Sequence, residues 1–153
     1  MTKREFTLVV ITVLVMCIPV SILAYQNKQL SEMPSAVYDW NTVKAVKTKT
    51  GEKRQFFDSP TATLDNIECH VSTLNVGETA HPPHQHPEEE LTIVKEGTVE
   101  VLVNGELKKA GAGSVIFAAA NQLHNIKNAG TTPATYYAIK WKTAKTASAV
   151  KTN

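Results

Sequence analysis

Short strand-like segments separated by turn residues fill the centre of this 153-residue chain. Residues 67–74 (IECHVSTL), 91–97, 98–106 and 134–141 (ATYYAIKW) alternate in polarity or run in β-branched and apolar residues. Asn104–Gly105, at the end of the run 98–106, predicts a hairpin whose returning strand is 106–110 (ELKKA), because the turn positions of the tightest hairpins need a positive φ. No helical periodicity competes in this stretch of sequence. Many short strands joined by turns predict an all-β sandwich or barrel.

The sequence divides into four parts. Residues 1–25 form an apolar targeting segment, and the polar residues 26–41 form a linker or an arm lying on the domain. Residues 42–142 contain all the strand-like runs and are predicted to be one β-barrel domain, as the chain length suggests. The Lys- and Thr-rich residues 143–153 are predicted to be a flexible tail.

The N-terminal segment is typical of a secretory signal peptide. Lys3 and Arg4 precede the apolar run Leu8–Ala24, and a small residue ends that run. An uncleaved membrane anchor is the alternative, because a spanning helix needs about 20 apolar residues. Pro19 favours cleavage, since it would disturb a helix. In both cases the sequence predicts an exported domain, either periplasmic or secreted, that contacts the membrane only if the segment stays uncleaved.

The net charge argues against a nucleic-acid partner, and the cysteine count bears on whether an internal disulfide can form. A formal net charge of +2, with no nucleic-acid-binding motif, argues against a nucleic-acid partner. Cys17 and Cys69 are the two cysteines, and removal of the targeting segment would leave Cys69 alone. An internal disulfide is then excluded. Cys69 is expected to be a small buried core residue.

The stretch HPPHQHPEEE, residues 81–90, points to metal chemistry. His84 and His86 are two positions apart, so a strand would direct both rings to one face, and Glu90 can join them after a short turn. His124 follows a later strand-like run. Imidazoles and a carboxylate converging in a barrel suit Fe, Mn, Ni, Cu or Zn. A solvated, charged loop is the alternative, and His81 is predicted to lie at the rim, with a substrate contact or proton relay as its alternative role.

The same residues carry a family resemblance. His84-x-His86-x₃-Glu90-x₆-Gly97 resembles the first motif of the cupin superfamily, and Gly113-x₁₀-His124-x₃-Asn128 resembles the second. The second motif departs from the family pattern at three turn positions. Gly111 stands where the family usually has a proline, Ser114 where it has an acidic residue, and Asn121 near the place of another proline.

The resemblance implies a single-domain cupin with a conserved type 2 barrel, which is a jelly-roll-like fold. It implies that His84, His86, Glu90 and His124 bind one divalent transition metal and leave open positions for water, substrate or dioxygen. It also implies a homodimer, for which the outward-facing Leu91 and Ile93 and an N-terminal strand from residues 37–46 are candidate contacts.

The predicted pocket is mostly apolar and suits a small organic ligand. The residues predicted to face it are Thr92, Val94, Val101, Val103, Phe117, Tyr137 and Ile139. A metalloenzyme acting on an oxygen-rich small molecule is the first hypothesis, with dioxygenase-like or isomerase and lyase chemistry. Glu90 and Tyr137 are its candidate bases. Because no other acid or base is evident, a non-catalytic binding module for a carbohydrate or small organic acid is the alternative.

Overall fold

The computed structural model describes residues 2–7, 11–12, 17–18, 22 and 32–149, which fall into two units, Met1–Met33 and Pro34–Asn153. In the first unit the described residues 3–7, 11–12, 17–18 and 22 are helical. Most of the predicted targeting segment lies outside the described residues. Among those that are described, no helix has the length and apolar character needed to cross a membrane.

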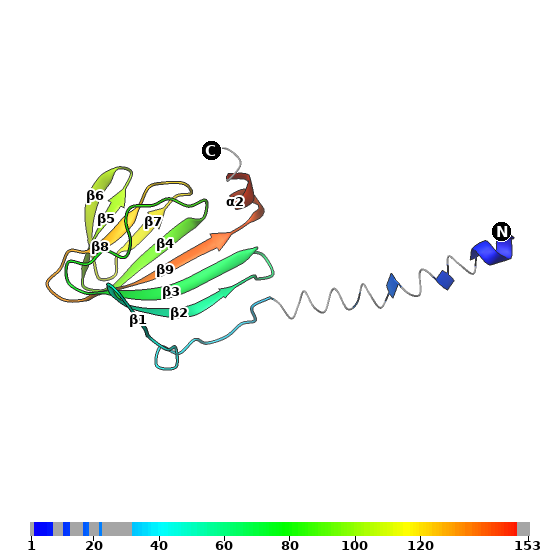
Figure 1. The fold of residues 1–153 in the computed structure, drawn as a ribbon, viewed down its shortest axis with the longest axis horizontal. Coiled ribbons are helices and arrows are strands. Elements are labelled where there is room, and N and C mark those ends of the chain that lie inside the picture. Colours follow the sequence, from blue (N-terminus) through cyan, green and yellow to red (C-terminus); the bar gives the residue numbers. More distant parts are fainter. Residues whose placement is uncertain (1, 8–10, 13–16, 19–21, 23–31, 150–153) are drawn as a thin grey trace. The chain divides into compact units, whose positions relative to one another are not determined.

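The second unit is built from two antiparallel sheets (Figure 1). One sheet has the strand order β1-β2-β3-β9-β4-β7, and the other has the order β6-β5-β8. The strands are β1 (Val46–Thr48), β2 (Gly51–Ser59), β3 (Asn66–Leu74), β4 (Glu89–Glu96), β5 (Thr98–Val103), β6 (Glu106–Gly111), β7 (Val115–Ala118), β8 (Asn125–Asn128) and β9 (Ala134–Lys142). The all-β prediction is confirmed. The C-terminal segment expected to be flexible contains a short helix, α2 (Ala144–Ala149).

The predicted hairpin is present between β5 and β6. Asn104 and Gly105 have φ angles of 52° and 78°, as a tight turn with two left-handed positions requires. The turn places Val103 opposite Glu106 and extends the pairing back to Thr98 opposite Gly111. Local turn chemistry therefore sets the register of this pair.

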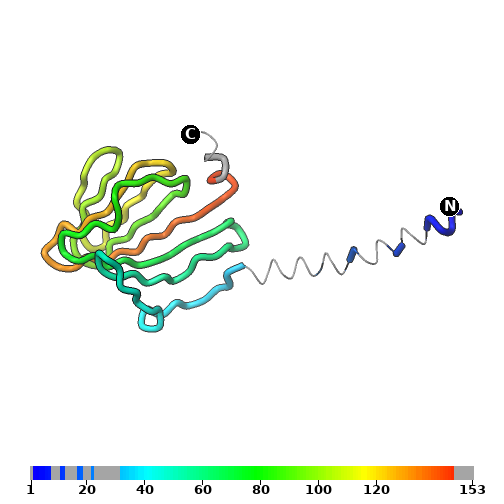
Figure 2. Tube along the Cα trace, in the orientation of Figure 1, coloured from blue at the N-terminus to red at the C-terminus, as the bar shows by residue number. Residues whose placement is uncertain are grey.

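A late strand lies between two earlier ones. β9 pairs with β3 on one side and with β4 on the other, as the colour change across the large sheet shows (Figure 2). The buried core includes residues of both sheets: Leu74, Val94, Ala134, Tyr136 and Ala138 from the large sheet, and Val99, Val101 and Ile126 from the small one. Packing between the sheets therefore holds the barrel together.

The predicted facing of β9 is wrong. Tyr136 and Ala138 line the interior, whereas the ring of Tyr137 lies outside against Phe56, with the ring centroids 6.0 Å apart. Ile139 is two residues beyond Tyr137 on the same strand, so its side chain also points to the outer face. Apolar alternation misleads here because the outer face of the sheet is also buried: Cys69 and Val71 are 6% and 1% exposed.

The other predicted pocket residues have mixed outcomes. Thr92, Val101 and Val103 line the cavity, and Val94 is buried in the core. Phe117 is 49% exposed, so its predicted inward position is wrong. It follows Ile116, which does line the cavity, and the strand alternation therefore turns Phe117 outward.

Residues 34–45 form an arm without strand structure, and the strand expected over 37–46 begins only at Val46. The ring of Trp40 is contacted by two cations, with the Arg54 guanidinium 4.6 Å and the Lys95 ammonium 4.3 Å from its centroid. Its centroid is also 6.3 Å from that of Phe56. The ring of Tyr38 packs on that of Phe57, with centroids 5.1 Å apart, so two aromatic side chains attach the arm to the large sheet.

Trp40→Ala is expected to release this arm and to lower the free energy of unfolding by about 1–2 kcal/mol, because two cation–π contacts of about 0.5–1 kcal/mol each are lost. Limited proteolysis would measure cleavage within residues 34–45, and urea unfolding would measure stability. Val37→Ala is the matched control, since Val37 is 95% exposed. Equal protease resistance in both variants would contradict the prediction.

Candidate metal centre

Backbone hydrogen bonds join the two histidine-bearing segments. The N–H of His84 donates to the carbonyl of His124 at 3.0 Å, and the N–H of His124 donates back to the carbonyl of His84 at 2.9 Å. A third bond runs from the N–H of Asn121 to the carbonyl of His86 at 2.8 Å. The segment before β4 therefore lies directly against the segment before β8, and histidines distant in sequence become neighbours.

Asn121 explains one departure from the family motif. Its φ is 60°, a left-handed value that asparagine tolerates and that the ring of proline forbids. Its N–H is also the donor to His86, and proline has no N–H. In this chain the turn is therefore built on an asparagine, and the family's proline would not fit it.

The ring nitrogens of His84, His86 and His124 form a candidate metal site, with one ligand atom from each lying within 4.8 Å of the others. Nitrogens on opposite sides of one ion are about 4.2 Å apart, given metal–nitrogen distances of about 2.1 Å. Small ring movements would therefore suffice to bind an ion.

Two of these rings are oriented by carbonyl groups, which can only accept hydrogen bonds. Nδ1 of His86 donates to the carbonyl of Glu88 at 3.0 Å, and Nδ1 of His124 donates to the carbonyl of Gln122 at 2.8 Å. The lone pairs are then on Nε2. Both Nε2 atoms are buried and have no hydrogen-bond partner within the described structure. The same is true of Nδ1 of His84. Buried, unpaired imidazole nitrogens that face one another fit a transition metal.

Glu90 lies beside this cluster. Its Oε2 is 3.6 Å from Nε2 of His86, and its Oε1 accepts a hydrogen bond from the Thr92 hydroxyl at 3.4 Å. Burial acts to raise the pKa of Glu90, but the neighbouring imidazoles, His86 first and then His124 and His70, outweigh it and hold that pKa below its usual range. Glu90 is therefore a carboxylate placed to complete the predicted ligand set.

Two neighbours of the cluster remain outside it. The side chain of Glu88 pairs with Lys142 at 3.2 Å, and its Oε2 is 3.4 Å from Nδ1 of His86, the nitrogen turned away from the cluster. His81 is exposed at the cavity rim, and its ring packs on that of His84 with centroids 4.0 Å apart.

The cluster opens into a cavity of about 350 Å³ whose sheet wall is polar. Apolar atoms make up the larger share of the cavity lining, as predicted, but one wall contains three ionisable residues that are not among the predicted pocket residues: Glu68 and His70 of β3 and Lys140 of β9. Polar positions on a strand usually face solvent, so alternation by itself does not indicate a cavity wall. The signal was present in IECHVSTL, where Glu68, His70 and Ser72 alternate with apolar residues.

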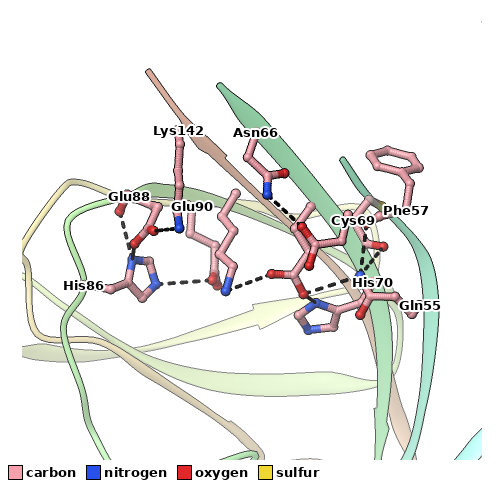
Figure 3. A network of polar contacts seen from close by, with 12 residues as sticks. Gln55, Phe57, Asn66, Cys69, His70, His86, Glu88, Glu90 and Lys142 are labelled. Atoms are coloured by element: carbon pink, nitrogen blue, oxygen red, sulfur yellow. Dashed lines mark hydrogen bonds and ion pairs between the residues drawn. The ribbon is translucent and has the colours of Figure 1, made fainter. Parts of the chain in front are cut away.

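Glu68 is the centre of a polar network on this wall. Figure 3 shows this network, with its member His70 labelled. Its Oε2 pairs with Lys140 at 2.8 Å, while its Oε1 accepts from Nδ1 of His70 at 3.0 Å and lies 3.5 Å from Lys53. Burial acts to raise the pKa of Glu68, but Lys140, His70 and Lys53 outweigh it and lower the pKa to about 2. Burial lowers the pKa of His70, with a further contribution from Lys53.

The pKa of Glu68 predicts how stability depends on pH. Because its pKa is depressed in the folded state, its stabilising contribution is present above pH 4.5 and is lost as the pH falls toward about 2. Glu68→Gln is therefore expected to lower stability most at pH 7, with the difference from wild type shrinking between pH 5 and pH 2. Thermal unfolding across that range measures it. A difference that does not change with pH would contradict this prediction.

Comparison with known proteins identifies the barrel. Residues 70–140 match the family model described as a cupin domain. This match begins within β3 and ends within β9, and it includes the histidine cluster, Glu90, His70 and Lys140. A comparison with curated protein sequences finds no match.

Several solved structures share the fold. An RmlC-like cupin from Shewanella frigidimarina is 14% identical, with 73% of this chain and 95% of that chain covered and a TM-score of 0.59. The polyketide cyclase RemF from Streptomyces resistomycificus is 20% identical, with 71% and 80% covered and a TM-score of 0.57. A predicted oxalate decarboxylase from Thermotoga maritima is 18% identical, with 71% and 100% covered and a TM-score of 0.57. At these identities the likeness establishes the fold.

Proposed function

Because residues 70–140 of this chain form a cupin domain, we propose that the protein is an exported metalloenzyme acting on an oxygen-rich small molecule. The observation that carries the proposal is the set of buried, unpaired nitrogens on His84, His86 and His124. These three residues would hold one divalent transition metal, Fe, Mn, Ni, Cu or Zn, with Glu90 as the fourth ligand. Such an ion supplies Lewis-acid chemistry, or redox chemistry if it is Fe or Cu.

The cavity supports an enzyme over the binding-module alternative. The binding-module alternative requires that the pocket has no acid or base beyond the metal ligands. His70 lines the cavity wall and is such a group, which favours an enzyme. Tyr137, by contrast, faces away from the cavity and is withdrawn as a candidate base. A volume of about 350 Å³ suits a small organic ligand. The reaction class, dioxygenase-like or isomerase and lyase, depends on the metal.

Export and dimerisation are parts of the same proposal. Export is supported by Lys3 and Arg4 preceding the apolar run Leu8–Ala24. Intact-mass measurement of the protein recovered from the bacterial periplasm or medium tests it. A homodimer is supported by an apolar outer face on β4 and β7: Leu91, Ile93, Val115 and Phe117. A monomer mass by light scattering at micromolar concentration would count against the dimer.

Metal content is the direct test of the proposed site. The full chain, purified without a histidine tag, would be analysed by inductively coupled plasma mass spectrometry. About one transition metal per chain is the expected result, and the identity of the ion selects between oxygen and Lewis-acid chemistry. A chain that binds none of the five ions after reconstitution would refute the proposal.

A further inference from the structure

The polar wall of the cavity contains an imidazole that belongs to no predicted ligand set. His70 projects from β3 into the cavity, and its side chain is 17% exposed. It sits on a row of paired residues across the sheet, with Gln55 opposite on β2 and Ala138 opposite on β9. The next inward-facing row, two residues before His70 on β3, contains Glu68, Lys140 and Glu90. The imidazole is therefore one inward row and two strands away from Glu90, a predicted metal ligand on the same inner surface.

The hydrogen bond to Glu68 fixes which nitrogen of His70 is available. Glu68 is ionised, since its pKa is lowered to about 2, and a carboxylate can only accept. Nδ1 of His70 therefore donates to Glu68 Oε1 across 3.0 Å. The lone pair is then on Nε2 in the neutral ring. Lys140, at 2.8 Å, and Lys53, at 3.5 Å, in turn hold the carboxylate.

Such a carboxylate–imidazole pair is the arrangement that makes histidine a general base, because the carboxylate orients the ring and stabilises it once it is protonated. Other inward groups are poorer candidates. Burial raises the pKa of Tyr136 to about 12, and Lys140 is bound to Glu68, with its pKa raised. Cys69 is on the other face of β3. Glu90 is committed to the cluster.

We propose that His70, positioned by Glu68, is the general base of this pocket and acts on a small 2-oxo acid. The inference depends on the proposed function, since an ion held by the histidine cluster would bind the carboxylate and carbonyl oxygens of that acid. A 2-oxo acid fits because removal of the proton next to its carbonyl needs an electrophile at the oxygen and a base at the carbon. This cavity offers both from separate parts of the chain: the histidine cluster from the segments before β4 and β8, and His70 from β3.

The proton-transfer step balances within the pocket. Nε2 of His70 takes a proton from the carbon beside the carbonyl, and the electron pair of that C–H bond moves into the carbonyl group to give an enolate. The resulting imidazolium is stabilised by Glu68. Return of a proton to the same carbon regenerates the acid and neutral His70, so in D₂O the position becomes deuterated.

Pyruvate is the probe for this step. Loss of its methyl signal in D₂O would be followed by proton NMR with the full chain, and metal content would be measured on the same sample. A blank with an equal concentration of free metal corrects for exchange without protein. His70→Asn is the test variant, because its amide N–H keeps the bond to Glu68 while the Nε2 base is removed. Glu106→Gln, an exposed acid on β6 paired with Lys108, is the control.

The wild type is expected to exchange pyruvate, and His70→Asn to lose at least about 100-fold in the rate at saturating pyruvate, as for a general base. The half-saturating concentration should stay within about twofold, because His70 acts in the step and not in binding. Glu68→Gln should lose at least about tenfold with the same split, and Glu106→Gln should match wild type.

A wild-type rate in His70→Asn would overturn the inference, as would a metal-loaded wild type that does not exchange pyruvate. In the second case the metal site would still stand. A wild type that binds no metal would refute the proposed function instead. If that metal-free protein also fails to exchange pyruvate, this inference is overturned as well. If it does exchange pyruvate and His70→Asn abolishes the exchange, the role of His70 is supported.

Discussion

His86→Ala and His124→Ala are each expected to weaken metal binding at least about 100-fold and to leave less than a tenth of an ion per chain after dialysis against a chelator. Each substitution removes a buried Nε2 whose ring is already oriented by a carbonyl. Loss of one ligand and its oriented ring is a larger change than loss of an outer partner, which costs about 10- to 100-fold. Mass spectrometry of the dialysed protein measures the loss.

Glu88→Ala is the matched control for these variants. Its carboxylate is 3.4 Å from Nδ1 of His86, but the hydrogen bond that orients the ring comes from its backbone carbonyl, which alanine keeps. Thermal unfolding gives a second measurement, since an ion at about 100 times its Kd stabilises the folded state by about 2.7 kcal/mol. If Glu88→Ala and His86→Ala lose metal alike, the ligand assignment is wrong.

Gly97→Ala is expected to destabilise the fold by at least about 3 kcal/mol. Gly97 has a φ of 81°, which costs a residue with a Cβ about 1–2 kcal/mol. An added Cβ would also meet the Ala134 Cα at 2.8 Å and the Pro133 carbonyl oxygen at 2.9 Å. Ala134 is fully buried, so the neighbouring backbone must shift. Urea unfolding measures the change in free energy.

Gly105→Ala separates the two parts of that cost. Gly105 has nearly the same φ, 78°, but a Cβ there would meet nothing within 4 Å. Its expected cost is therefore only the backbone part, about 1–2 kcal/mol. Equal losses in the two variants would show that close contact with β9 does not matter at Gly97. The glycine that ends the first motif is thus explained by packing against Pro133 and Ala134.

Features that depend on neighbours in sequence could be predicted. The Asn104–Gly105 hairpin follows from two adjacent residues, and the alternation of 67–74 follows from strand geometry. The His84, His86 and Glu90 spacing also placed three groups on one side of a short segment. Their meeting with His124 needed the family resemblance, because it depends on main-chain pairing between distant segments.

The facing of β9 could not be predicted from its own residues. In ATYYAIKW both faces are buried, one by the other sheet and one beneath Phe56 and the Trp40 arm. Hydrophobicity then gives no preference between Tyr136 and Tyr137. The polar wall was missed for a related reason: Glu68 and Lys140 stabilise each other across β3 and β9, and sequence alone does not show that pairing.

The reciprocal hydrogen bonds between His84 and His124 have a consequence for how the protein obtains its ion. They are made by the main chain, so the two segments stay joined when the metal is stripped. Many small metal domains fold only around their ion, and their choice of metal is made during folding. Here the backbone bonds that join the two ligand-bearing segments need no metal ligand. If the site binds an ion as proposed, the ion could be exchanged without separating these segments, and the metal bound would follow the supply of ions around the folded protein.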